Sequence, residues 1–367
     1  MMRQIALSIL CCTVLVGSAA AEDPVSFADA RLKAAVEDAL WIDDPTPSDM
    51  LGLTSLDASS LGITHLTGLE YAANLQSLNL RRNKMTDLTP LAGLIQLQDL
   101  DVSRTGDTGL SDISPLTGLV NLQRLHIDNN QVSNISPLAG LTDLRYLDLH
   151  DNNRILDISA LAGLVRLEYL VLRNTRIWDV SALAGMKDLR YLNLAENLLI
   201  GVSPLAGMGH LEQLELYGNP LSNISDLTGM TSLSVLRMLR TELNNQAYCG
   251  HLQQILNNNP DLFLEYDPNP RPPTGLTASD GTYPDKVRVS WNPVCNGPLY
   301  ISYYRVSRAS SQDGPRTAIG PWQTSLTFDD TTALPGTTYY YWVQTATSGQ
   351  GVNPGDLTSP DTGWLKE

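Results

Sequence analysis

The stretch LQRLHIDNNQVSNISPLAGLTD (122–143) decides the fold, because its spacing of leucines returns along the chain with a period of 22 residues. The pattern is equally clear in LQSLNLRRNKMTDLTPLAGLIQ (75–96), LRYLNLAENLLIGVSPLAGMGH (189–210) and LEQLELYGNPLSNISDLTGMTS (211–232). Repeats begin at Leu53, Leu75, Leu97, Leu122, Leu144, Leu167, Leu189, Leu211 and Leu233, and those from Leu97 and Leu144 are 25 and 23 residues long. Such a period predicts a solenoid whose stacked repeats build an extended concave surface suited to binding.

We number the positions within a repeat from its first leucine. Leucines at positions 1, 4 and 6 predict a short strand with one buried face, and stacking predicts a parallel sheet spaced by about 4.8 Å. Position 9 is usually Asn, whose amide can bond backbone groups inside the following turn. That column contains Asn83, Thr105, Asn130, Thr175, Asn197, Asn219 and Thr241. Later aliphatic residues spaced by three predict 3₁₀-like or short helices on the convex side.

Position 15 is serine in six repeats, often followed by proline. These residues are Ser114, Ser136, Ser159, Ser181, Ser203 and Ser225. Ser before Pro is a helix-start signal, so we expect the serines to cap short convex helices rather than to act as nucleophiles.

Both ends of the solenoid carry segments that could cover its core. FADARLKAAVEDAL (27–40) has apolar residues on one helical face, with Ser26 as the expected N-cap. At the other end, residues 246–258 predict a second helix, and LFLEYDP (262–268) alternates like a closing strand.

The first 21 residues predict export. They contain one Arg, an apolar run from Ile5 to Val16 and a small-residue cleavage site at 19–21, as in a secretory signal peptide. The run is too short to span a membrane. Cleavage removes Arg3 and no acid, leaving 23 basic against 39 acidic residues. This acidity argues against nucleic acid or an anionic membrane as partner.

The composition changes after the repeats. PNPRPPTG (268–275) predicts a semi-rigid extended spacer. Runs of β-branched and aromatic residues follow in VRVSW (287–291), YISYYRVSRAS (300–310), TSLTFDD (324–330) and TTYYYWVQTA (337–346), and they predict an all-β sandwich. The tail resembles a fibronectin type III domain, in which Trp291 and Tyr304 are core aromatics and Tyr339 belongs to a tyrosine corner. Arg-Gly-Asp is absent.

The leucine spacing is that of leucine-rich repeats. The phrase Asn-Ile-Ser-Pro-Leu-Ala-Gly-Leu (134–141) and the helical cap resemble bacterial internalin-like proteins over residues 24 to 268. The resemblance implies a concave sheet that grips a protein partner, with a β-domain behind it. The chain departs from the family in its type III-like tail and in lacking an LPxTG motif. Its expected layout is a signal peptide (1–21), a helical cap (22–52), repeats (53–243), a C-terminal cap (244–268), a linker (269–273) and a type III-like domain (274–367).

Positions 3, 5 and 7 point away from the leucine core and form the expected concave face. Position 3 carries tyrosine on three consecutive repeats, and exposed aromatics among charges are typical of interface hot spots. The expected partner-binding residues are Tyr146, Asp148, His150, Tyr169, Arg173, Tyr191, Asn193 and Tyr217. The alternative is that strands simply favour tyrosine.

Two other classes of function remain open. Tyrosine rows also stack on sugar rings, so a carbohydrate-binding protein is the alternative reading. An enzyme is not expected, because the chain has no G-x-S-x-G, H-E-x-x-H or phosphate-binding loop.

We expect no cofactor and assign no metal. Asp101, His126, Asp128, Asp148 and His150 offer ligands of the type that zinc prefers. However, residues one repeat apart would have to converge on a single point.

Cys249 and Cys295 are the cysteines that remain after cleavage. A bond between them would clamp the tail to the solenoid, but Cys249 also suits a buried position in the cap helix. We expect two unpaired thiols.

Overall fold

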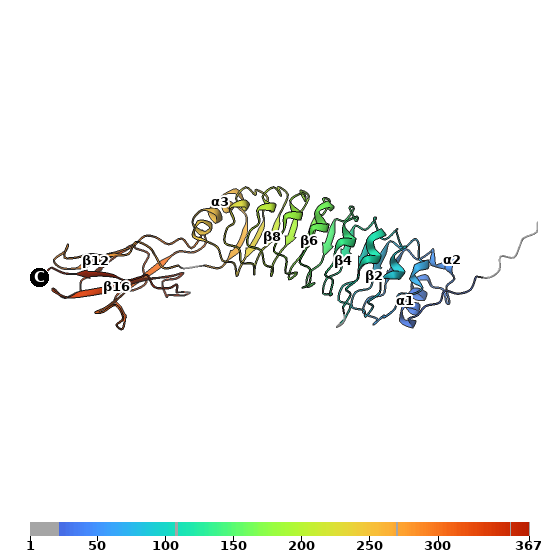
Figure 1. Ribbon diagram of the computed structural model, residues 1–367, viewed down its shortest axis with the longest axis horizontal. Helices are drawn as coiled ribbons and strands as arrows, with labels where there is room; N and C mark the ends of the chain where they lie inside the picture. The colour runs from blue at the N-terminus through green and yellow to red at the C-terminus, as the bar shows by residue number, and fades with distance from the viewer. Residues whose placement is uncertain (1–21, 107–108, 269–270, 353, 367) are drawn as a thin grey trace, which may run out of the picture.

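The computed structural model describes residues 22–106, 109–268, 271–352 and 354–366, so the predicted signal peptide lies outside it. The described chain is elongated. An arc of stacked repeats carries a small β-structure at its C-terminal end (Figure 1). No helix in these described ranges is long and apolar enough to cross a bilayer.

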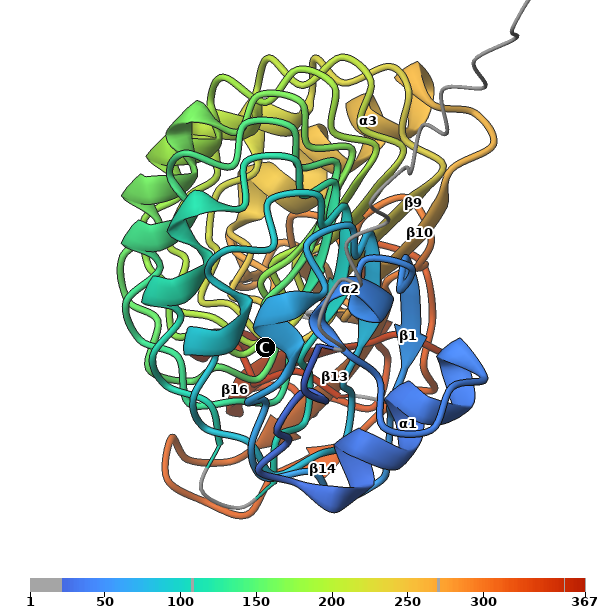
Figure 2. The ribbon, with the colours of Figure 1, turned by 90° about the vertical axis from the view of Figure 1, so that its right-hand side faces the viewer.

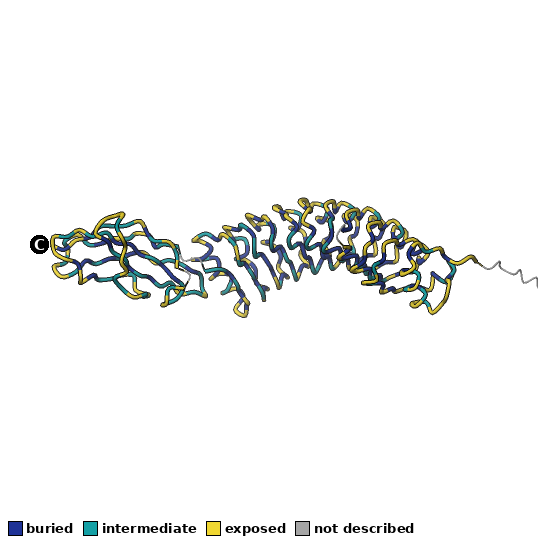
Figure 3. Tube along the Cα trace, turned by 90° about the horizontal axis from the view of Figure 1, so that it is seen from below, coloured by how far each residue is buried: buried dark blue, intermediate teal, exposed yellow. Residues whose placement is uncertain are grey.

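One ten-stranded parallel sheet runs the length of the solenoid, with its strands in chain order. They are β1 (Ser55–Asp57), β2 (Ser77–Asn79), β3 (Asp99–Asp101), β4 (Arg124–His126), β5 (Tyr146–Asp148), β6 (Tyr169–Val171), β7 (Tyr191–Asn193), β8 (Gln213–Glu215), β9 (Val235–Met238) and β10 (Phe263–Tyr266). The register pairs the central leucines of neighbouring repeats, such as Leu125 with Leu147. These leucines are buried inside the solenoid, while the turns at its surface are exposed (Figure 3). The predicted solenoid is therefore confirmed.

Short 3₁₀ turns stack opposite the sheet (Figure 2). They are η1 (Leu69–Tyr71), η2 (Thr89–Leu91), η3 (Ser114–Gly118), η4 (Ser136–Leu138), η5 (Ser159–Gly163), η6 (Ser181–Leu183), η7 (Ser203–Leu205) and η8 (Ser225–Leu227).

The expectation that the serines cap these turns is wrong. Each serine is the first residue of its turn, and the residue before it is aliphatic and makes no side-chain cap. In five of the six turns the cap comes from the Asp or Asn at position 13, and the turn from Ser203 has Gly201 there instead. Asn134 accepts from the Ser136 backbone N–H at 3.0 Å, and Asp157 accepts from that of Ser159 at 2.8 Å.

Buried asparagines hold neighbouring turns together, as position 9 predicts. Asn219 donates from Nδ2 to the carbonyls of Leu194 and Leu216, both at 2.9 Å, and accepts from the Leu199 N–H. Where position 9 is threonine, its hydroxyl can bond the position-9 asparagine of the next repeat. The Thr105 hydroxyl donates in this way to Asn130 at 2.5 Å. Asn152 is a further member that precedes an insertion in its repeat.

Helices cover the two ends of the solenoid. α1 (Ala30–Leu40) buries Leu32 and Val36, and α2 (Pro47–Met50) follows it. The N-cap of α1 is Asp29, whose carboxylate accepts from the Arg31 N–H at 2.9 Å, so the prediction of Ser26 is wrong. The C-terminal end has the π-helical turn η9 (Ala247–His251), then α3 (Leu252–Asn258), and β10 closes the sheet as expected.

The tail forms two antiparallel sheets. β11 (Thr277–Ala278), β12 (Val287–Ser290) and β15 (Thr327–Asp330) make one; β13 (Tyr303–Ala309), β14 (Thr317–Ala318), β16 (Thr338–Ala346) and β17 (Asp361–Trp364) make the other. Trp291 and Tyr304 are buried in its core as expected, with ring centroids 5.5 Å apart. The buried hydroxyl near the expected tyrosine corner belongs to Tyr341, which donates to Asp330, and Tyr339 is only half-buried.

A disulfide joins Cys249 to Cys295, so the expectation of two unpaired thiols is wrong. The reason is the packing at the junction. The Tyr266 hydroxyl donates to the Asn296 carbonyl and accepts from the Leu299 N–H, which brings the loop after β12 against the cap. The two cysteine Cα atoms lie 5.1 Å apart, within the range of a disulfide.

Candidate protein-binding surface

Three adjacent strands place three tyrosines in one row. The parallel register pairs Tyr146 of β5 with Tyr169 of β6, and Tyr169 with Tyr191 of β7. The leucines that follow them in each strand are fully buried. Because successive side chains in a strand point to opposite faces, the tyrosines lie on the concave face.

The three rings stack on one another. Ring centroids are 4.5 Å apart between Tyr146 and Tyr169, and 4.1 Å apart between Tyr169 and Tyr191, with interplanar angles of 9° and 5°. His126 tilts against the near end at 4.5 Å. We call Tyr146, Tyr169 and Tyr191 the tyrosine stack. Both faces of the Tyr169 ring are covered, so the stack offers ring edges and hydroxyl groups to a ligand.

The hydroxyls of Tyr146 and Tyr169 stay protonated well above neutral pH. Burial raises the pKa of Tyr146, and the nearby Asp148 and Asp128 carboxylates raise it further. Burial likewise raises the pKa of Tyr169, with help from its tyrosine neighbours. Tyr146 and Tyr169 therefore offer neutral hydroxyl groups that can donate or accept hydrogen bonds.

A cluster of carboxylates and imidazoles adjoins the stack. Asp148 bonds His150 Nδ1 at 2.7 Å, and the Asp128 carboxylate lies 3.6 Å from His150 Nε2. The hydrogen bond to Asp148 raises the pKa of His150 despite its burial. Burial also raises the pKa of the Asp128 carboxyl. Possible ligand atoms of His126, Asp128 and Asp148 lie within 4.8 Å of one another, so three of the five candidate metal ligands do converge.

We assign no metal to this cluster, in which one oxygen of each carboxylate already accepts hydrogen bonds. Asp148 accepts from the backbone N–H and the ring of His150, and Asp128 accepts from the Asn129 amide at 2.9 Å.

The other predicted residues have more local roles. Asn193 accepts from the Ala195 N–H at 3.0 Å, as Asp148 does from His150, so position 5 partly serves to turn the chain. Arg173 occupies position 7 of the repeat that follows the repeat of His150. Its Nε is buried and has no hydrogen-bond partner. Tyr217 lies outside the tyrosine stack, and the Arg240 guanidinium sits 5.8 Å from its ring centroid.

Sequence reasoning missed position 2, where opposite charges on adjacent repeats form ion pairs beside the stack. Arg145 bonds Glu168 at 2.5 Å and Arg190 bonds Glu212 at 2.6 Å. A hollow of about 380 Å³ opens along this edge, lined by Gln98, Asp99, Gln123, Arg124, Arg145, Tyr146, Glu168 and Tyr169. The alternation of sign down one column is the signal that could have revealed it.

Family models match most of the described repeats and the tail. A model of leucine-rich repeats in two copies matches residues 73–118 and 120–163, and a second leucine-rich repeat model matches residues 166–221. The fibronectin type III model matches residues 271–359. No protein with a curated description matches the chain significantly.

Among solved structures, internalin C2 of Listeria monocytogenes is 34% identical, with a TM-score of 0.54 over 56% of this chain and 92% of that one. The internalin inlF from the same organism is 24% identical, with a TM-score of 0.58 over 69% of this chain and 81% of that one. The plant peptide hormone receptor RGFR1, solved in complex with RGF2, shares the repeat fold at 20% identity and a TM-score of 0.50, over 60% of this chain and 36% of that one.

Proposed function

This chain belongs to the internalin-like leucine-rich repeat proteins and carries a C-terminal fibronectin type III domain; from that premise we propose that it is an exported, non-enzymatic protein that binds a protein partner on its concave face. The tail is the spacer or accessory binding module. Export rests on the residue pattern of the first 21 residues.

The tyrosine stack is the observation that carries this proposal. Its rings hold one another rigid, so little side-chain entropy is lost when a partner packs on their edges. The position-2 ion pairs and the Asp148–His150 pair lie beside it and supply polar contacts. An aromatic centre with a polar rim is the usual arrangement of a protein interface.

The same stack disfavours the alternative of a glycan ligand. Sugar binding by aromatic side chains uses ring faces, and both faces of Tyr169 are occupied by neighbouring rings. We therefore favour a protein over a polysaccharide as the ligand of this surface.

The test begins with affinity enrichment on the mature protein, residues 22–367, followed by mass spectrometry and measurement of affinity for the enriched partner. Changing Tyr146, Tyr169 and Tyr191 together to Ala should weaken binding by about 3 kcal/mol, the scale of a hot-spot cluster. Tyr71 is exposed outside this row and provides the matched control. Unchanged affinity with an intact circular dichroism spectrum would contradict the proposal.

A further inference from the structure

Three large apolar side chains are exposed on consecutive repeats, away from the tyrosine stack. Leu156, Trp178 and Ile200 all occupy position 12 and are 55%, 64% and 73% exposed. We call them the apolar strip. Other repeats have a hydroxyl residue at this position, namely Thr64, Thr86, Ser111, Ser133 and Ser222. The strip is thus a local departure from the repeat, and the solenoid core does not require it.

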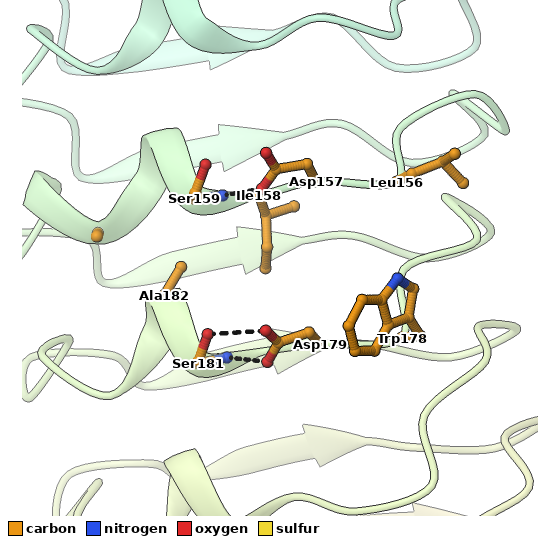
Figure 4. Close-up of a pocket in the computed structure, with 9 residues that line it drawn as sticks. Leu156, Asp157, Ile158, Ser159, Trp178, Asp179, Ser181 and Ala182 are labelled. Carbon is orange, nitrogen blue, oxygen red and sulfur yellow. Dashed lines mark hydrogen bonds between the residues drawn. The ribbon is translucent and has the colours of Figure 1, made fainter.

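A hollow adjoins the strip. It measures about 500 Å³ and is lined by Leu156, Asp157, Ile158, Ser159, Ala162, Trp178, Asp179, Ser181 and Ala182. Figure 4 shows Leu156 and Trp178 on consecutive repeats, with the carboxylates of Asp157 and Asp179 beside them. Both carboxylates cap 3₁₀ turns through Ser159 and Ser181 and still face the hollow. Among the described residues that line it, no side chain is positively charged.

We propose that the apolar strip and its hollow form a second binding surface, for a polypeptide segment that presents an apolar side chain next to Lys or Arg. Exposed apolar patches with a polar rim mark interaction sites, and Trp is the residue most enriched in hot spots. The two carboxylates select a basic neighbour by charge. Leu156 and Ile200 are aliphatic, which favours a peptide over a sugar at this surface.

The chain provides its own matched variant. Changing Leu156, Trp178 and Ile200 to Ser restores the residue type found at position 12 of other repeats, so the fold is retained. Asp157→Asn with Asp179→Asn removes both charges but keeps the turns capped, because Asn134 and Asn223 hold the same place in their repeats.

The experiment selects a phage-displayed random peptide library on the mature protein, with counter-selection on the serine variant. Enriched peptides should carry an aromatic or aliphatic residue beside Lys or Arg. Synthetic versions should bind the serine variant about tenfold more weakly or worse. The asparagine variant should bind the peptides about threefold more weakly, and its affinity for them should no longer depend on the salt concentration.

The tyrosine-stack variant should bind these peptides like the wild type, which separates this surface from the concave one. No enrichment, equal recovery on the serine variant, or a consensus without a basic residue would each overturn the proposal. So would a dimer in sedimentation velocity that the serine variant abolishes, since the strip would then be covered by a second copy of the chain.

Discussion

At the scale of single residues, buried polar side chains hold the repeats in register. Each position-9 asparagine spans two neighbouring turns, and leaving its backbone partners unpaired is costly because water cannot reach them. The sequence revealed this column, because amide groups recur at one place in a leucine pattern. It did not reveal that position 5 also bonds the backbone, since that role depends on the turn that follows the strand.

Asn219→Ala should destabilise the solenoid by about 3 kcal/mol, because the Leu216 carbonyl and the Leu199 N–H lose their partner inside the protein. The Leu194 carbonyl keeps its hydrogen bond from Asn197. Urea unfolding followed by circular dichroism measures the loss. Asn134→Ala is the control, since its side chain is exposed and makes one such bond. Equal losses from the two changes would contradict a special role for the buried column.

Asp330 links stability to pH in the tail. Burial raises its pKa, but hydrogen bonds from Thr332, Tyr341 and Arg308 outweigh burial, and the pKa lies below its ordinary value. The carboxylate therefore stabilises the fold above its unfolded pKa of about 3.9, and this contribution is lost as the pH falls through the folded value.

Asp330→Asn should cost about 3 kcal/mol at neutral pH, because it leaves Arg308 without its carboxylate. The difference from the wild type should shrink as the pH falls below about 4. Denaturant titrations of the full chain, followed by tryptophan fluorescence, measure both curves. A constant difference at every pH would disprove this linkage.

At the scale of elements, the convex turns begin by a different device from the one expected. Ser-Pro indicated a capped helix, and a 3₁₀ turn does begin at each serine. Except at Ser203, which Gly201 precedes by two residues, the bond that starts the turn is made by the Asp or Asn side chain two residues earlier, which accepts from the serine backbone N–H. The sequence contained both the Asp or Asn and the serine. Residue propensities alone could not tell which of the two side chains accepts the hydrogen bond that begins the turn.

Asn223→Ala should destabilise the repeats by about 1 kcal/mol, the usual loss of a cap. Ser225→Ala should be nearly neutral, because Ser225 contributes its backbone N–H to this contact and Ala retains that group. Thermal unfolding of both variants measures the difference. If Ser225→Ala were more destabilising than Asn223→Ala, the serine would be the cap and this assignment would be wrong.

At the scale of the whole molecule, the repeats could be predicted and the junction could not. A period in the leucines specifies neighbours one repeat apart, so the sheet, its register and the tyrosine row follow from sequence. Stacking of the three rings on one another does not, because it depends on side-chain rotamers. The disulfide also escaped prediction, because its two cysteines are separated by 46 residues and the approach is made by Tyr266, an aromatic residue with no sequence signal for that role.

The oxidised mature protein should show no reactive thiol when unfolded without reductant. Changing Cys249 and Cys295 to Ser should destabilise the junction by about 4 kcal/mol, because the bond closes a long loop in the unfolded chain. It should also free the tail to change its angle to the solenoid. Thiol titration tests the first statement, and small-angle scattering of the two forms tests the second. Two titrated thiols in the oxidised protein would refute the bond.

The bridge also decides how the molecule carries tension. A pull between the two ends of the mature chain runs along the repeats to Cys249, crosses the two sulfur atoms, and continues from Cys295 into the tail. The residues between the two cysteines, including α3 and β10, form a side branch of this covalent path, held to the rest of the fold by contacts such as the pairing of β10 with β9. Stretching the protein would therefore unravel the repeats or the tail while their junction stays closed, and a reducing agent would lengthen the molecule under load by releasing that branch.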